Sequence, residues 1–414
     1  MLADPMHQKK VSLLNLTVVV AALGYFVDIY DLLLFGIIRI PSLREMGLTP
    51  DQITTDGESI LSWQMFGLML GGILWGIVGD KKGRSSVLFG SILLYSLGNI
   101  ANGFVQTVEQ YKIIRFVAGI GLAGELGAGI TLVAELLPKE KRGIGTSIVA
   151  GFGITGAVAA FFIKENFHWR TCYFIGGGLG LALLALRVSV LESGMFKTMK
   201  AKAVKRGNIM MLLNNRDRLL RYVQSILIGV PTWLVIGILI TFSKEFAKEF
   251  GITAEIDPGK AIMFAYAGLA VGDVSIGLVS QWLKSRKKAL YVFYFLTFIF
   301  MILYFTIQWN GSAFMMYFLC TMLGFASGFW AIFVTIGAEQ FGTNLRATAA
   351  TTIPNMVRGT VPLMLMLFQF LRGLPGVGYV NGGIYTCAIV FILCVIAVIT
   401  SKETFHKDLN FEEH

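Results

Sequence analysis

Charged residues are scarce in this chain of 414 residues, since only 14% are Asp, Glu, Lys or Arg, against about 25% in soluble domains. That shortage excludes an ordinary soluble enzyme, a disordered chain and a fibrous repeat. Cysteines are also few, and all four lie in apolar surroundings: Cys172, Cys320, Cys387 and Cys394. They form no CxxC motif and have no metal-type histidine spacing, so we expect neither a metal site nor a cofactor.

Apolar residues are abundant, at 55% of the chain, and the mean hydropathy is +0.69. About 20 apolar residues cross a bilayer as a helix. Apolar segments of that size fall at 13–38, 58–79, 85–106, 110–136, 143–163, 170–190, 221–242, 260–283, 289–308, 311–337, 347–371 and 377–400. We therefore predict an all-α polytopic membrane protein with twelve transmembrane helices. The first segment has no A-x-A cleavage motif and reads as a span.

Most of the 35 lysines and arginines fall on one side of these spans, together with both termini. This bias places the termini in the cytoplasm of a cell whose plasma membrane holds the protein. It also explains the net charge of +10 without nucleic acid. The basic segment 191–220 is the longest interruption. We expect one bundle of six helices in 1–190, a cytoplasmic linker in 191–220, a second bundle in 221–402 and a cytoplasmic tail in 403–414.

Two short motifs recur at matching places in the two halves. Residues 76–84 read GIVGDKKGR and residues 277–287 read GLVSQWLKSRK, each directly after a second span. Residues 134–143 read AELLPKEKRG and residues 338–347 read AEQFGTNLRA, each at the end of a fourth span. Repeats of this kind indicate an internal duplication, which many transporters contain.

The GxxxDKxGR stretch resembles the signature loop of the major facilitator superfamily, and the twelve-span layout resembles that superfamily over the whole chain. Residues 30–36 (YDLLLFG) and 115–125 (RFVAGIGLAGE) resemble the metabolite–proton symporter family, while the sugar-porter family shares several of these features. The resemblance implies two six-helix bundles with inverted repeats, working as a monomer by alternating access. Gln281, Ser285 and Ala123 depart from the family patterns.

Ionisable residues inside spans are costly and mark functional sites. Asp31 and Arg115 fall at similar depths in the outer half of the membrane, counting 1.5 Å per residue. A proton that competes with Arg115 for Asp31 would then couple transport to the pH gradient, as the resemblance also implies. A static ion pair is the alternative. Asp28 and Glu125 are further candidates for carrying the proton, or for polar structural contacts.

Arg358 falls near the middle of the eleventh span, where a guanidinium suits a carboxylate or phosphate on a substrate. The alternative is an ion pair with Asp273. Other residues that we expect to contact substrate share a polar or aromatic side chain within a span: Tyr30, Asp28, Gln64, Asn355, Trp330 and Gln224.

Charged residues at the cytoplasmic ends of spans are expected to gate the two bundles, with Gly83 allowing a tight turn. They are Asp80, Arg84, Glu135, Arg142, Glu339 and Arg346. The prediction is therefore a proton-coupled symporter that imports a small organic acid or related metabolite across the lipid bilayer. The alternatives are a sugar or nucleoside transporter of the same fold, a drug efflux antiporter, and a transport-inactive membrane sensor.

Overall fold

The computed structural model describes residues 16–82, 84–124, 139–192, 210–307, 309, 311–405 and 412–413. Within these ranges all regular secondary structure is helical. Eight segments of this part of the chain are long and apolar enough to cross a membrane. The four remaining predicted spans correspond to α3, α4, α6 and the pair α15–α16, which are shorter, more polar or described only in part. The all-helical membrane fold is thus confirmed.

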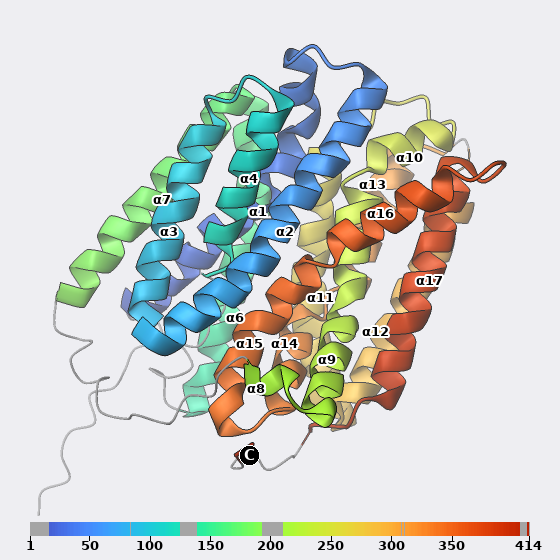
Figure 1. Cartoon of the computed structure of the whole chain (residues 1–414). Coiled ribbons are helices and arrows are strands. Elements are labelled where there is room, and N and C mark those ends of the chain that lie inside the picture. The colour runs from blue at the N-terminus through green and yellow to red at the C-terminus, as the bar shows by residue number, and fades with distance from the viewer. Residues whose placement is uncertain are drawn as a thin grey trace, which may run out of the picture.

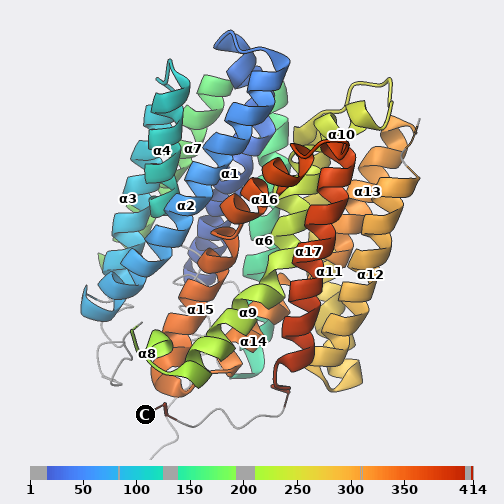
Figure 2. The ribbon, with the colours of Figure 1, turned by 45° about the vertical axis from the view of Figure 1, so that its right-hand side comes forward.

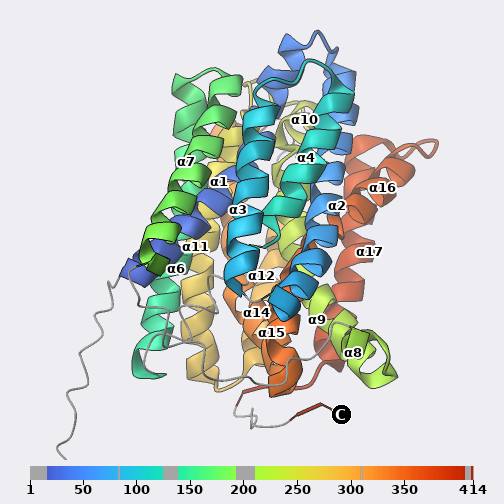
Figure 3. The same ribbon diagram turned by 60° about the vertical axis from the view of Figure 1, so that its left-hand side comes forward.

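The N-terminal half holds α1 (Leu16–Glu45), α2 (Pro50–Lys82), α3 (Arg84–Asn102), α4 (Val108–Leu122), α6 (Lys139–Asn166) and α7 (Trp169–Glu192). These helices gather on one side of the molecule (Figure 1). Turning the molecule brings α3, α4 and α7 to the front, with α1 and α6 partly behind them (Figure 3).

The C-terminal half begins with α8 (Met210–Leu213), α9 (Arg216–Leu234), a π-helical segment η2 (Val235–Ile240), α10 (Ser243–Glu249), α11 (Pro258–Leu283) and α12 (Arg286–Thr306). It continues with α13 (Ala313–Ala326), α14 (Trp330–Glu339), α15 (Thr343–Arg358), α16 (Val361–Arg372) and α17 (Gly378–Thr400). The C-terminus lies at the end of the molecule opposite α10 (Figure 2). We refer to the α10 end as the outer end, following the predicted orientation.

Two predicted spans are broken. The segment 311–337 divides into α13 and α14 around Ser327 and Phe329, and the segment 347–371 divides into α15 and α16 around Gly359. The start of α14 is held by Asp273 of α11, whose Oδ1 accepts a hydrogen bond from the Ala331 backbone N–H at 3.1 Å. This bond satisfies an N–H group that the break leaves without a helical partner.

Close helix packing repeats between the halves. A Cβ atom built at Gly67 of α2 would lie 2.2 Å from the carbonyl oxygen of Phe116 in α4. One built at Gly268 of α11 would lie 2.1 Å from the carbonyl oxygen of Thr321 in α13. Glycine lets the two backbones approach in both pairs. The contact pattern of the second and fourth spans thus recurs in the eighth and tenth, as a duplicated chain requires.

Candidate functional site

Arg115 of α4 is fully buried inside the N-terminal half and is held by three hydrogen bonds. Its Nε donates to Gln64 Oε1 at 3.3 Å, its Nη1 to Asn99 Oδ1 at 3.1 Å and its Nη2 to the backbone oxygen of Asp31 at 3.1 Å. The Tyr173 ring adds a cation–π contact at 5.5 Å. Asp31 and Arg115, which we expected at one depth, therefore lie in one buried cluster, together with Gln64, which we expected to contact substrate.

The carboxylate of Asp31 is buried beside Arg115, yet no salt bridge of 4.0 Å or less joins the two side chains. The positive charge of Arg115 still attracts the Asp31 carboxylate electrostatically. The Asn99 side chain lies beside both groups. Asp28 is also buried, one helical turn earlier on α1. A carboxylate that is near a cation but not bound to it can take up a proton without breaking a salt bridge.

Arg358, at the end of α15, is 2% exposed. Its guanidinium carbon lies 5.9 Å from the ring centre of Trp233 in α9 and 5.7 Å from that of Trp330 in α14. Its Nη1 donates a long hydrogen bond of 3.5 Å to Asn355. Within the described ranges no carboxylate oxygen forms a salt bridge with it, and its Nε has no hydrogen-bond partner. Asp273, the partner considered from the sequence, binds α14 instead.

Asn355 places Arg358 at the seam between the halves. Its Nδ2 donates to the backbone oxygen of Ala123, just after α4, at 2.9 Å. The neighbouring Gly359 faces Met69 of α2, whose side chain would lie 2.6 Å from a Cβ atom built there. Arg358 therefore lies where helices of both halves meet. Substrates bind at this place in transporters built from two repeats.

Two residues that we expected to contact substrate lie elsewhere. Tyr30 donates from its hydroxyl to the Cys172 backbone oxygen at 2.8 Å, which directs it into the N-terminal half against α7. Gln224 lies in the first part of α9 and donates to Thr400 Oγ1 at 3.0 Å, near the inner ends of α9 and α17. Sequence position alone cannot show which face of a helix carries a side chain toward the seam.

The structure describes only some of the predicted gating residues. Gly83, Glu125 and Glu135 lie outside the described residues, and so do the side chains of Asp80, Arg84 and Arg142. Glu339 accepts a hydrogen bond from Arg286 of α12 at 3.3 Å, and Arg346 donates to the Phe341 backbone oxygen at 3.4 Å. Both of these contacts stay within the C-terminal half.

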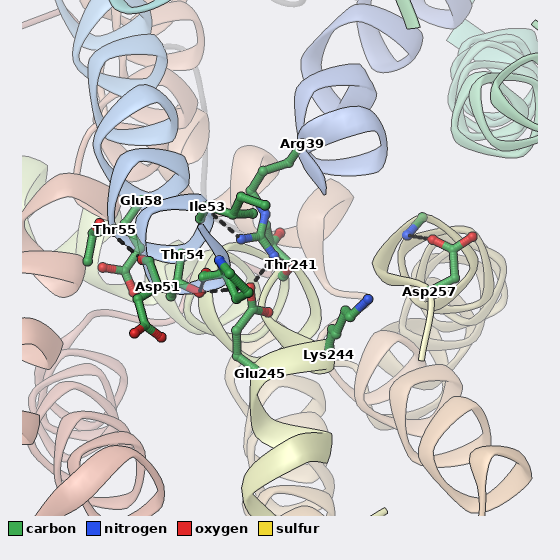
Figure 4. Close-up of polar contacts among 12 residues, drawn as sticks. Arg39, Asp51, Ile53, Thr54, Thr55, Glu58, Thr241, Lys244, Glu245 and Asp257 are labelled. Carbon is green, nitrogen blue, oxygen red and sulfur yellow. Dashed lines mark hydrogen bonds and ion pairs between the residues drawn. The ribbon is translucent and has the colours of Figure 1, made fainter. Parts of the chain in front are cut away.

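A buried ion pair at the outer end joins the halves through Arg39, which directly follows the first predicted span, 13–38. Because α1 continues to Glu45, Arg39 is helical and its side chain is fully buried. It binds Glu245 of α10 at 2.7 Å and the Thr241 backbone oxygen at 3.3 Å, and it lies 4.6 Å from the Phe242 ring centre. Figure 4 shows this group between α1, α2 and the C-terminal half.

Two more ion pairs join the halves at the same end. Arg372 of α16 donates from Nη1 and Nη2 to the two carboxylate oxygens of Glu58 in α2, at 2.5 and 2.8 Å. Lys164 of α6 binds Asp257, just before α11, at 2.7 Å. In the sequence, Arg39 directly follows an apolar run and Glu58 opens one, but nothing near either residue indicates its partner in the other half.

Membrane-crossing helices in two packed halves, with buried arginines at and beside their seam, define a polytopic membrane transporter. The chain belongs to the Major Facilitator Superfamily, whose sequence profile matches residues 21–359. Members of this superfamily are transporters and not enzymes.

Relatives and solved structures agree with this assignment. A protein of Haemophilus influenzae named for metabolite transport is 27% identical over 355 residues, covering 82% of this chain and 84% of that protein. The benzoate transport protein of Acinetobacter baylyi is 32% identical over 183 residues, which is 42% of this chain and 38% of that protein. The structure of a proton:xylose symporter matches with a TM-score of 0.67 at 16% identity, covering 95% of this chain and 97% of that one, which shows the fold.

Proposed function

We propose that this protein is a proton-coupled symporter that imports a small organic acid by alternating access across the plasma membrane. Arg358 carries the proposal, because it is a buried cation at the seam with no carboxylate partner among the described residues. An uncompensated buried charge is unfavourable. A carboxylate on the substrate would neutralise it through charge-assisted hydrogen bonds.

The organic-acid class has support from one relative, because the substrate named for the Acinetobacter baylyi protein is a carboxylate. The matched part of that protein is under half of its length. The likeness to a sugar symporter rests on 16% identity and carries the fold alone. Arg358 is therefore the feature that favours an acid over a sugar.

Proton coupling is assigned to Asp31 and Arg115. When Asp31 is charged, the attraction of the guanidinium holds α1 against α4, and protonation weakens that attraction. Asp28, one turn away on the same helix, is the second group that can share the proton. The α1–α4 contact would thereby respond to the proton gradient, and α1 also contributes Arg39 to the outer end.

The test uses Asp31→Asn in proteoliposomes that are acidic outside. We expect the variant to lose accumulation of labelled acid against its gradient while keeping exchange of labelled for unlabelled acid, because binding survives without a proton site. Asp51→Asn, at an exposed position at the start of α2, is the matched control. Accumulation by Asp31→Asn equal to that of the natural protein would contradict the assignment.

A further inference from the structure

The surroundings of Arg358 are aromatic on two sides. Trp233 and Trp330 come from different helices, α9 and α14, and both are buried, at 4% and 8% exposure. Phe333 continues this surface, with its ring centre 5.0 Å from that of Trp330. The Arg358 guanidinium lies near both indoles, within the distance at which a cation and an aromatic ring attract each other.

The indole N–H groups of Trp233 and Trp330 form no hydrogen bond in the described part of the chain. Buried tryptophans usually place their N–H group on a hydrogen-bond acceptor. In the described part of the chain, neither the Trp233 nor the Trp330 Nε1 has such an acceptor, unlike Trp75, which donates to the Ile120 backbone oxygen at 2.6 Å. Arg358 Nε is likewise without an acceptor. Three donors therefore lie in one small region without acceptors.

The Asn355 side chain is poorly placed for a ligand rich in hydroxyl groups. The Asn355 amide nitrogen is occupied by the backbone oxygens of Ala123 and Thr351, at 2.9 and 3.1 Å. Its Oδ1 faces Arg358. Tyr25 and Tyr266 also lie close enough to Arg358 to interact with its charge. A ligand at this place therefore meets a cation, indole N–H groups, two phenol side chains and flat ring faces. A hydroxyl-rich solute needs several further partners, whereas a planar acid needs only these.

We propose that the substrate is a planar aromatic carboxylate, whose carboxylate binds Arg358 and whose ring packs against the indoles of Trp233 and Trp330. This inference rests on the proposed function, since it specifies which organic acid the site takes. The carboxylate supplies acceptors for the free donors. The ring supplies the offset or edge contacts that aromatic pairs prefer.

The experiment measures equilibrium binding of labelled benzoate to the purified full-length protein, with unlabelled competitors. Cyclohexanecarboxylate keeps the carboxylate and the six-carbon ring but is not planar, and benzamide keeps the plane but has no charge. We expect benzoate to bind roughly tenfold more tightly than cyclohexanecarboxylate, since about 1.4 kcal/mol corresponds to a factor of ten. Benzamide should compete weakly.

Variants then separate the ring contact from the charge contact. Trp330→Leu and Trp233→Leu should each weaken benzoate about tenfold, the equivalent of one aromatic contact, and leave cyclohexanecarboxylate unchanged. Trp330→Phe keeps an aromatic face and should retain most of the affinity, which also controls for folding. Arg358→Gln should lose both acids. Trp282→Leu, at a position that is 81% exposed, is the matched control.

The outcomes distinguish this inference from the proposed function. Equal binding of the two acids, or equal weakening of both by Trp330→Leu, would overturn the aromatic specificity and leave the organic-acid function standing. If neither acid binds and neither is accumulated in proteoliposomes, the organic-acid function itself is wrong. Retained binding of benzoate by Arg358→Gln would remove Arg358 from the site.

Discussion

Arg39 is a buried guanidinium whose charge is balanced by a carboxylate from the other half of the molecule. Its side chain is 0% exposed and that of Glu245 is 14% exposed. Removing one partner from a buried pair leaves an uncompensated charge, which costs far more than the pair contributes. At the scale of single residues, this pair and the Arg372–Glu58 pair, whose Glu58 side chain is 0% exposed, should therefore be more sensitive to substitution than the exposed charges at the outer end.

We predict that Glu245→Gln lowers the free energy of unfolding by about 3 kcal/mol, because Arg39 would remain buried without its ion-pair partner. Thermal unfolding in detergent measures the change. Glu255→Gln is the matched control, since Glu255 lies on the same side of the molecule and pairs with Lys244 while its side chain is 77% exposed. Exposed pairs contribute little. Equal unfolding temperatures for the two variants would show that burial of Arg39 does not make its partner essential.

The buried charges were predictable to different degrees. Asp31 and Arg115 stand deep within apolar segments, so counting residues along two helices was enough to place them at one depth. Arg39 and Glu58 stand at the edges of such segments, where helix ends predicted from hydropathy carry errors of several residues. Their burial depends on α10 and α16 of the other half, and that long-range contact has no local sequence signal.

At the scale of secondary structure elements, the segment after α17 forms hydrogen bonds with the start of α12. Glu403 accepts hydrogen bonds from Ser285 Oγ and from the backbone N–H groups of Arg286 and Lys287, the latter two at 3.0 and 3.2 Å. A negative charge at a helix N-terminus is favourable. Burial raises the pKa of Glu403, but these hydrogen bonds and that from Phe405 outweigh it and lower the pKa below its usual value.

Glu403→Gln should reduce the free energy of unfolding by about 1 kcal/mol, as the loss of a helix cap does. Because the folded-state pKa lies below the unfolded one, the stabilisation is complete above the unfolded pKa of about 4.3. It is lost as the pH falls through the folded-state pKa. Unfolding temperatures measured from pH 7 downward should therefore converge for the variant and the natural protein, whereas the exposed Glu412→Gln should match the natural protein throughout. A difference that persists unchanged in acid would contradict the cap.

Hydropathy predicts the helices well, because each span must be apolar and must pair its backbone N–H and C=O groups within its own helix. The break in the tenth span was not predicted, whereas Pro354 and Pro362 in the sequence indicate an irregular backbone at the break in the eleventh. Gly359 separates α15 from α16, and the loss of helical bonds near Ala331 is compensated by Asp273, which lies 58 residues away in the chain. Similarly, the glycines at 67 and 268 were visible in the sequence, but their carbonyl partners on α4 and α13 were not.

At the scale of the whole molecule, the outer end is closed. In the described part of the chain three ion pairs join the halves there, from α1 to α10, from α2 to α16 and from α6 to the residue before α11. Beneath them Gly36 of α1 packs against Ile262 of α11, whose Cδ1 would lie 3.1 Å from a Cβ atom at Gly36. Passage of substrate through this end requires that all of these contacts separate.

We predict that the double variant Glu58→Gln/Glu245→Gln opens the outer end more often. Loss of at least about 3 kcal/mol from the closed state raises the open population roughly a hundredfold or more, if the open state lacks the pairs. A cysteine introduced at Ile262, which is 0% exposed, reports the opening through its rate of labelling by a membrane-impermeant maleimide added outside. Labelling should be slow with the native ion pairs and much faster in the double variant.

A cysteine at the exposed position Asp51 should be labelled at the same rate in both backgrounds, which controls for access of the reagent. The buried native Cys172 should stay unlabelled in both, because opening differs from unfolding. If position 262 is labelled no faster in the double variant while position 51 reacts normally, the ion pairs do not hold the halves together. If Cys172 becomes reactive as well, the carboxylates stabilise the fold as a whole and are not a gate that separates during transport.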